Sequence, residues 1–108
     1  MRVHIHPLSV NKAWRGGRRF KTHDYLQYEK ELSSLLPRRQ VVSGPVSVSL
    51  TFSLNQLYRA DLDNFIKPLM DILVKRQYID DDRKVLKYGL QKKKTQGVEY
   101  IDIEINKI

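Results

Sequence analysis

Apolar and polar residues alternate in two segments of the chain, which predicts two strands that each bury one face. From 46 to 53 every second residue is apolar, and serine or threonine fills the positions between them. Residues 97–107 repeat the pattern with three isoleucines. Successive side chains of a strand point to opposite faces, so each segment should turn its apolar face toward a core. A third strand is predicted over 84–92, joined to the last one as a hairpin by a turn at 95–97.

Apolar residues at helical spacing predict two helices, one before and one after the strand at 46–53. The first should run from about residue 23 to 36, with Thr22 as its N-cap. The second should run from about 63 to 76. It carries Pro68 early, where the missing N–H costs less than it would in the middle of a helix.

The predicted elements follow the order β-α-β-α-β-β, with a short strand at 3–6 and a polar, basic loop at 8–21 before the first helix. No repeat or linker divides residues 1–108, so we expect a single domain. The expected fold class is α/β, a sandwich of one mixed β-sheet and two main helices. Hydrophobic residues make up 41%, enough for a modest core, and the absence of cysteine excludes disulfides, thiolate metal sites and cysteine nucleophiles.

The net charge of +8 is distributed unevenly along the chain. Residues 61–82 hold six of the twelve acids against three basic residues, so this segment carries −3 and the rest of the chain +11. A protein that only binds phosphate gains nothing from gathered carboxylates, because they repel it. A metal-dependent enzyme that acts on phosphates uses both features. At this level, ordinary surface charge that is unevenly scattered remains the alternative.

The acidic segment contains a pattern suited to a hard cation. Asp61 and Asp63 are two residues apart, so in an extended chain both carboxylates leave the same face. Lys67 follows Asp63 by one helical turn, and the chain returns after the helix with three consecutive aspartates at 80–82. Carboxylate oxygens are the ligands that Mg²⁺ prefers. The pattern therefore predicts a magnesium site with a lysine beside the substrate phosphate.

Simpler roles are open for some of these residues. Asp63 or the residue after it can cap the second helix, although capping explains neither Asp61 nor the three consecutive aspartates. Asp71 stands four residues from both Lys67 and Lys75, a spacing typical of salt bridges, so we do not take it as a metal ligand.

Residues 61–68 read Asp-Leu-Asp-Asn-Phe-Ile-Lys-Pro, and the pattern continues with Asp71, Tyr78, Ile79, Asp81, Asp82 and Val85. This pattern resembles the RusA family of Holliday-junction resolvases. Residues 7–15, Pro-Leu-Ser-Val-Asn-Lys-Ala-Trp-Arg, are similar to the N-terminal segment of that family. The likeness runs from near the start of the chain through the last two predicted strands.

The resemblance implies a RusA-like fold and a Mg²⁺-dependent, homodimeric endonuclease that cuts four-way DNA junctions by paired symmetric nicks. Carried over by position, the catalytic residues are Asp61, Asp63, Lys67 and Asp82, and the three aspartates are the metal ligands. The essential aspartate of the family is the second of its pair, which selects Asp82. An additional aspartate before this pair leaves Asp81 as the second choice.

Two basic segments are candidates for contacts with DNA. The first lies in the loop at 8–21 and surrounds Trp14, which can stack on an unpaired base or simply pack on the sheet. The second is a run of lysines at the tip of the expected hairpin, which can also be a solubilising turn. The predicted DNA-binding residues are Lys12, Trp14, Arg15, Arg18, Arg19, Lys21, Lys92, Lys93 and Lys94.

No apolar run approaches the roughly 20 residues of a membrane span, and the N-terminus lacks the apolar region of a signal peptide. We therefore expect a cytoplasmic protein that associates with the nucleoid through DNA and has no membrane partner. His4 and His6 share one face of the first strand, but no third ligand is near in sequence, so zinc is not predicted.

Two other functions remain open at this stage. One is a non-catalytic module that binds branched or double-stranded DNA, in which the aspartates are structural. The other is a metal-dependent nuclease for another nucleic-acid structure, because the metal chemistry is the same for all these substrates.

Overall fold

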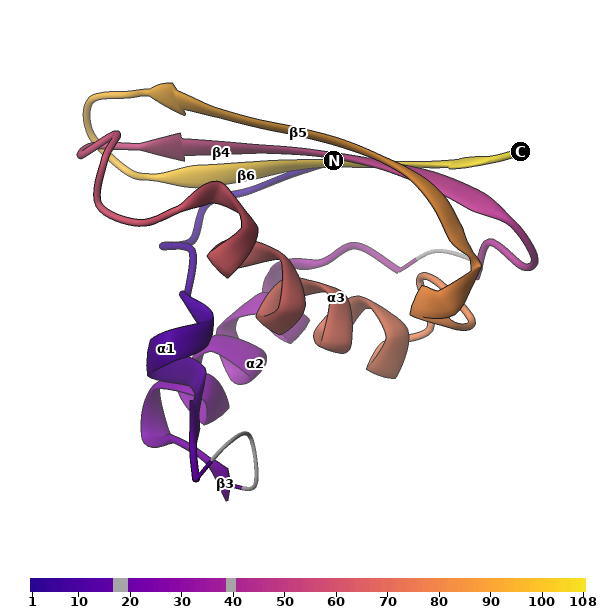
Figure 1. Ribbon diagram of the computed structural model, residues 1–108, viewed down its shortest axis with the longest axis horizontal. Helices are drawn as coiled ribbons and strands as arrows, with labels where there is room; N and C mark the ends of the chain where they lie inside the picture. The colour runs from indigo at the N-terminus through magenta and orange to yellow at the C-terminus, as the bar shows by residue number, and fades with distance from the viewer. Residues whose placement is uncertain (17–19, 39–40) are drawn as a thin grey trace.

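The computed structural model describes residues 1–16, 20–38 and 41–108. A four-stranded sheet in the spatial order β1-β6-β4-β5 forms one layer of the fold. The helices α1 (Val10–Ala13), α2 (His23–Leu35) and α3 (Ile66–Lys75) all lie on one side of this sheet and leave its other face uncovered (Figure 1). The prediction of an α/β fold with a mixed sheet in one compact domain is confirmed. The strands are β1 (Arg2–Val3), β4 (Val46–Leu54), β5 (Val85–Lys94) and β6 (Tyr100–Lys107).

The segment expected to be a loop at 8–21 contains secondary structure. It forms the short helix α1 (Val10–Ala13) and two short strands, β2 (Trp14–Arg15) and β3 (Phe20–Lys21), which pair antiparallel as a ribbon. Two of the predicted DNA-binding residues, Arg18 and Arg19, lie outside the described residues. The chain therefore has more elements than the predicted β-α-β-α-β-β order, and its first strand is shorter than expected.

The predicted hairpin of the last two strands is wrong, because β4 lies between them. β4 pairs parallel to β5 and antiparallel to β6. The helix α3 (Ile66–Lys75) connects β4 to β5 across one face of the sheet, which is the crossover that parallel neighbours need. After β5 the chain passes the end of β4, where the Thr95 N–H donates to the Leu54 carbonyl at 2.9 Å.

The burial of the strands explains this arrangement. The apolar residues of β4 are at most 1% exposed, so this strand needs a neighbour on each side and a helix layer above it. Most residues of β5 are exposed, and three consecutive lysines end it. An exposed, charged strand suits a sheet edge, where lysines also discourage pairing with other chains.

The two long helices lie close to their predicted positions. The helix α2 (His23–Leu35) begins after Thr22, whose hydroxyl accepts a hydrogen bond from the Tyr25 N–H at 3.2 Å, so the predicted cap is confirmed. The second predicted helix begins as the 3-10 helix η1 (Leu62–Phe65) and continues as α3, with Pro68 in its first turn. No helix in the described ranges is long and apolar enough to span a membrane.

Candidate active site

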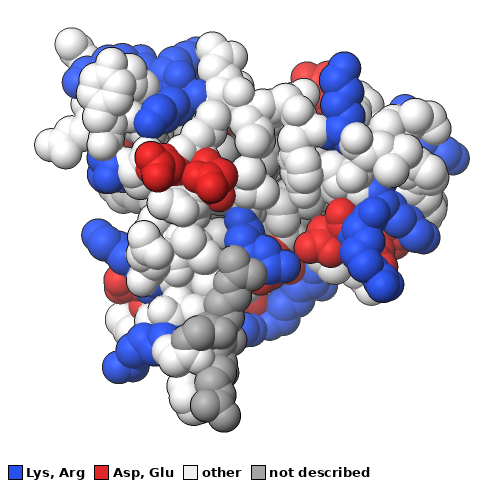
Figure 2. Space-filling view, viewed as in Figure 1, with Lys and Arg blue, Asp and Glu red and all other residues white. Residues whose placement is uncertain are grey.

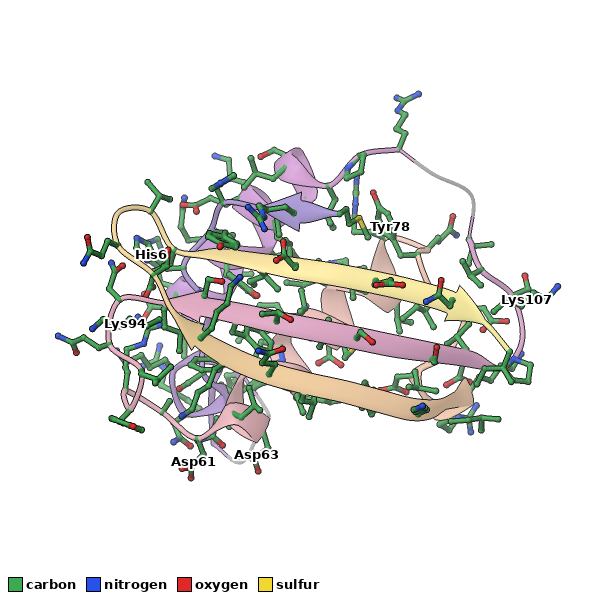
Figure 3. The ribbon with its side chains drawn as sticks, turned by 90° about the horizontal axis from the view of Figure 1, so that it is seen from above. His6, Asp61, Asp63, Tyr78, Lys94 and Lys107 are labelled. Carbon is green, nitrogen blue, oxygen red and sulfur yellow. The ribbon has the colours of Figure 1, made fainter. Side chains whose placement is uncertain are left out.

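The turn η1 carries Asp61 and Asp63, and one buried ring fixes it to the sheet. Phe65 is 1% exposed, and its ring centroid lies 5.2 Å from that of Phe52 in β4. The Asn64 N–H closes the turn on the Asp61 carbonyl at 3.1 Å. Since Phe65 points into the core, the polar side of the turn faces solvent. Figure 3 shows Asp61 and Asp63 side by side on this turn, both projecting outward from the ribbon.

Both carboxylates are exposed and make no hydrogen bond or ion pair with any residue that the structure describes. Neither side chain caps a helix, because η1 lacks a side-chain cap and α3 follows directly on Phe65. The capping role considered for Asp63 is therefore wrong. Two adjacent carboxylates without a cation partner suit a cation that comes from solution.

Lys67 lies on the first turn of α3 and contacts two carboxylates. Its Nζ is 2.9 Å from Asp71 Oδ1 and 3.4 Å from Asp82 Oδ2. The hydrogen bond to Asp71, together with the charges of both aspartates, raises the pKa of Lys67 above its ordinary value. The predicted salt bridge of Asp71 with Lys67 is confirmed, whereas Lys75 pairs with Glu29 on α2, at 2.7 Å.

The three consecutive aspartates have different partners. Asp80 accepts from Lys84 Nζ at 3.0 Å, and Asp81 accepts from the Arg83 guanidinium at 2.7 Å. The Arg83 side chain, helped by the Arg83 N–H, lowers the pKa of Asp81 to about 2. Asp81 is also the N-cap of η2 (Asp82–Lys84), so its carboxylate is engaged locally. Of the three, Asp82 is the one in contact with Lys67.

No three acidic, histidine or cysteine side chains in residues 1–16, 20–38 and 41–108 lie close enough together to hold a metal ion. In the structure, Asp82 contacts Lys67 and lies apart from the pair formed by Asp61 and Asp63. The pair still fits magnesium by its chemistry. Mg²⁺ is commonly held by one or two carboxylates while water and substrate phosphate supply its other ligands.

A groove extends from Lys67 to Lys21 of the basic ribbon β2–β3. Its lining includes Lys21 of β3, Tyr25 of α2 and the pair of Lys67 with Asp82. The Lys21 ammonium lies 5.0 Å from the centroid of the Tyr25 ring. Burial, followed by the charge of Asp71, raises the pKa of Tyr25 to about 12, so the ring stays a neutral wall of the groove.

The other described DNA-binding candidates of this segment lie on α1 and on the ribbon itself. Lys12 on α1 and Arg15 on β2 are exposed. Trp14 is partly buried, and its ring centroid lies 5.1 Å from that of Tyr25, so its ring packs on α2. Figure 2 shows acidic groups on one face of the molecule with lysine and arginine side chains close to them.

The lysines of the expected hairpin tip instead end the edge strand β5, and they alternate between the faces of the sheet. Lys92 pairs in register with Phe52 on the helix side, and its Nζ donates to the Ala60 carbonyl at 3.0 Å. Lys93 lies on the uncovered side, 5.9 Å from the Tyr100 ring centroid. Lys94 is exposed at the end of β5 (Figure 3). Of the three, Lys92 is therefore the one that contacts the loop leading into Asp61.

Three features of the site were not found by sequence reasoning. Tyr58, in the loop before Asp61, is 89% exposed. Burial and then the charge of Asp82 raise the pKa of Tyr88, whose phenol comes from β5. Glu99 is buried, 1% exposed, and forms an ion pair with Arg59 at 2.9 Å. A signal for Glu99 existed, since it has the parity of the buried isoleucines in the same strand pattern.

Comparison with known families agrees with the motif. The family model described as Endodeoxyribonuclease RusA matches residues 7–106, nearly the whole chain. A search of curated proteins found no match. The family match spans the turn η1, the helix α3 and the returning segment, and it implies a DNA-binding nuclease of the Holliday-junction resolvase class that acts in DNA recombination. The chain belongs to the RusA family of endodeoxyribonucleases.

Proposed function

We propose that this protein is a Mg²⁺-dependent endonuclease that resolves four-way DNA junctions by paired, symmetric nicks. Family membership implies a junction-resolving endonuclease; the metal, the symmetry of the nicks and the residue roles are inferences from the site. The observation that carries them is the pair Asp61 and Asp63. Both carboxylates are exposed on one turn, without a protein cation in the described residues, and next to the helix that presents Lys67.

The roles follow from these contacts. Asp61 and Asp63 would hold Mg²⁺, and Asp82 is the third carboxylate of the proposed site. When bound, Mg²⁺ would supply an activated water and neutralise charge on the phosphate. Lys67 places a positive charge close to the scissile phosphate, where it stabilises the charge that develops during hydrolysis. The contacts with Asp71 and Asp82 orient its ammonium.

The basic residues hold DNA over a turn that would otherwise repel it. Lys12, Arg15, Lys21 and Lys92 lie on the elements around the site, and the electrostatic attraction of such residues to phosphates supplies most non-specific affinity. Two matched cuts need two sites. We infer a homodimer with twofold symmetry, in which residues 1–108 of each copy form one endonuclease domain. Analytical ultracentrifugation of the protein at micromolar concentration tests the dimer.

The decisive experiment is cleavage of a synthetic four-way junction, with each of its four strands labelled in turn. With Mg²⁺, the wild type should nick two opposing strands at symmetric positions. Asp61→Asn should cut at least about 100-fold more slowly, because losing several kcal/mol of metal-dependent stabilisation corresponds to such a factor. Asp102→Asn is the matched control, since Asp102 pairs with Arg2 on β1 at 2.7 Å, away from the proposed site.

Three outcomes would contradict the proposal. Equal cutting by the wild type and Asp61→Asn would exclude a catalytic role for this carboxylate. A wild type that binds the junction and never cuts it would be a binding module. Faster cutting of a linear duplex or a single strand than of the junction would indicate a nuclease for another structure.

A further inference from the structure

Glu99 is a buried carboxylate outside the catalytic set, and three donors surround it. Its Oε1 accepts from His6 Nδ1 at 2.8 Å and from Arg59 Nη1 at 2.9 Å, and its Oε2 accepts from the Asn55 N–H at 2.7 Å. Burial favours the protonated form, but these hydrogen bonds outweigh it and hold the pKa of Glu99 below its ordinary value. A charge this deeply buried is costly unless it is paired, so its partners indicate what it holds in place.

Two of the three donors belong to the loop that leads into the catalytic turn. Asn55 starts this loop after β4, and Arg59 ends it two residues before Asp61. Glu99 therefore accepts hydrogen bonds from both ends of the loop. The loop has little structure of its own, since its internal backbone hydrogen bond, from the Arg59 N–H to the Gln56 carbonyl, is long at 3.3 Å.

Arg59 extends the same network into the turn. Its Nη2 donates to the Pro7 carbonyl at 3.4 Å, and its guanidinium carbon lies 5.7 Å from the centroid of the Phe65 ring. Phe65 lies in η1 between Asp63 and Lys67. A line of contacts thus runs from Glu99 through Arg59 to the residue that anchors the two catalytic aspartates.

We propose that Glu99 is a positioning residue that, through Asn55 and Arg59, holds Asp61 and Asp63 in the arrangement that binds Mg²⁺. This inference rests on the proposed function of the two aspartates. Groups that orient metal ligands without touching the metal typically change metal affinity by about 10- to 100-fold when they are removed. A carboxylate that only stabilised the fold would leave metal affinity unchanged in the folded protein.

The test compares Glu99→Gln with Glu104→Gln, a matched change on the opposite face of the sheet. Both variants replace a carboxylate by an amide of the same shape, and Glu104 lies in β6 with an exposed side chain. Calorimetric titration of the DNA-free protein with Mg²⁺ should give about 10-fold weaker binding for Glu99→Gln and wild-type binding for Glu104→Gln. Raised Mg²⁺ should restore junction cutting by Glu99→Gln. Its affinity for the junction without Mg²⁺ should be unchanged.

Hydrogen exchange separates a local effect from a general loss of stability. In Glu99→Gln, amides of residues 55–65 should exchange faster, while those of α2 keep their wild-type protection. Arg59→Gln provides a second variant that should weaken Mg²⁺ binding in the same way. The double variant should be no weaker than the more affected single one, because both changes break one line of contacts.

The results that overturn this inference differ from those that overturn the proposed function. Wild-type Mg²⁺ affinity in folded Glu99→Gln, or additive losses in the double variant, would remove the positioning role while the nuclease stands. Exchange that accelerates equally in α2 and in residues 55–65 would also remove it. A wild type that binds Mg²⁺ and cuts no junction would instead refute the function and leave the comparison of affinities valid.

Discussion

Replacing Lys67 with methionine separates a catalytic role for this lysine from a structural one. Methionine keeps the apolar stem of the side chain and removes its charge. In the structure the ammonium of Lys67 lies 2.9 Å from Asp71 and 3.4 Å from Asp82. We expect the rate of junction cutting to fall steeply while the fold is kept.

The cost in stability follows from the two distances and from exposure. Coulomb's law gives about 1.4 and about 1.2 kcal/mol for these pairs at the dielectric constant of water. The Lys67 side chain is 39% exposed and the two carboxylates are 30% and 37% exposed, so solvent screens both pairs. Partly exposed pairs contribute about 0.2–1 kcal/mol each after the entropy of ordering them. A loss of roughly 1 kcal/mol in all lowers the Tm of a domain of this size by about 4–8 °C.

The cost in rate should be several times larger. Removing one donor that stabilises charge developing in a transition state lowers kcat by about 100- to 1,000-fold, or roughly 3–4 kcal/mol. Single-turnover cutting of a labelled junction, with protein in excess and Mg²⁺ saturating, measures this rate without a contribution from weaker DNA binding. Thermal unfolding of the same samples measures the change in stability.

Lys75→Met is the matched control for this substitution. Lys75 lies two turns further along α3, and its Nζ pairs with Glu29 at 2.7 Å, so its loss should lower the Tm by a similar amount. Its effect on the cutting rate should be small. If Lys67→Met loses no more of the cutting rate than Lys75→Met does, the reasoning is refuted. Lys67 would then contribute no more to the cutting rate than a lysine that only forms an ion pair.

Three further predictions follow from the partners of individual side chains. Asp82→Asn should lower junction cutting by about 100-fold or more, whereas Asp80→Asn and Asp81→Asn should cut at nearly the wild-type rate, since both of these carboxylates are engaged with local cations. The pKa of Asp81 is about 2, against 3.8 for an unperturbed aspartate. The ionised side chain therefore contributes its full stabilisation above about pH 4 and loses it as the pH falls toward 2. In urea unfolding, the free energy of unfolding of Asp81→Asn should depend less on pH between about 4 and 2 than that of the wild type. Lys92→Ala should lower the slope of log junction affinity against log salt concentration by about one phosphate contact. Lys93→Ala, on the other face of the sheet, should leave this slope unchanged, and equal slopes for the two variants would contradict the prediction.

The strand at 46–53 and the hairpin show why some elements could be predicted and others could not. Alternation was sufficient for β4, because its apolar residues are buried on one face by the helices. The turn at 95–97 indicated correctly that the chain reverses between the last two strands. Which strand lies beside β5 depends on α3 crossing back to the sheet, and no local pattern near Gly97 contains that information.

The site shows the same division between local and distant contacts. Asp61, Asp63 and Lys67 are neighbours in sequence, so spacing alone was enough to group them. The contact of Lys67 with Asp82 spans 15 residues and depends on where the chain returns after α3. The pairing of Glu99 with the loop before Asp61 spans 40 residues or more, so only the folded sheet could show it.

The partners of the acidic residues change the meaning of the charge distribution. Four of the six acids at 61–82 pair with a lysine or arginine nearby, and Asp61 and Asp63 are the two without a cation partner among the described residues. Within this segment, the carboxylates without a cation partner are therefore concentrated at one turn. If the proposed site is correct, that turn repels a DNA phosphate when Mg²⁺ is absent, while the surrounding lysines attract it. Asp63→Asn should therefore bind a junction about threefold more tightly than the wild type in EDTA at low salt, and added salt should screen the gain. Unchanged binding would mean that DNA does not approach this turn, and the site would have to lie elsewhere.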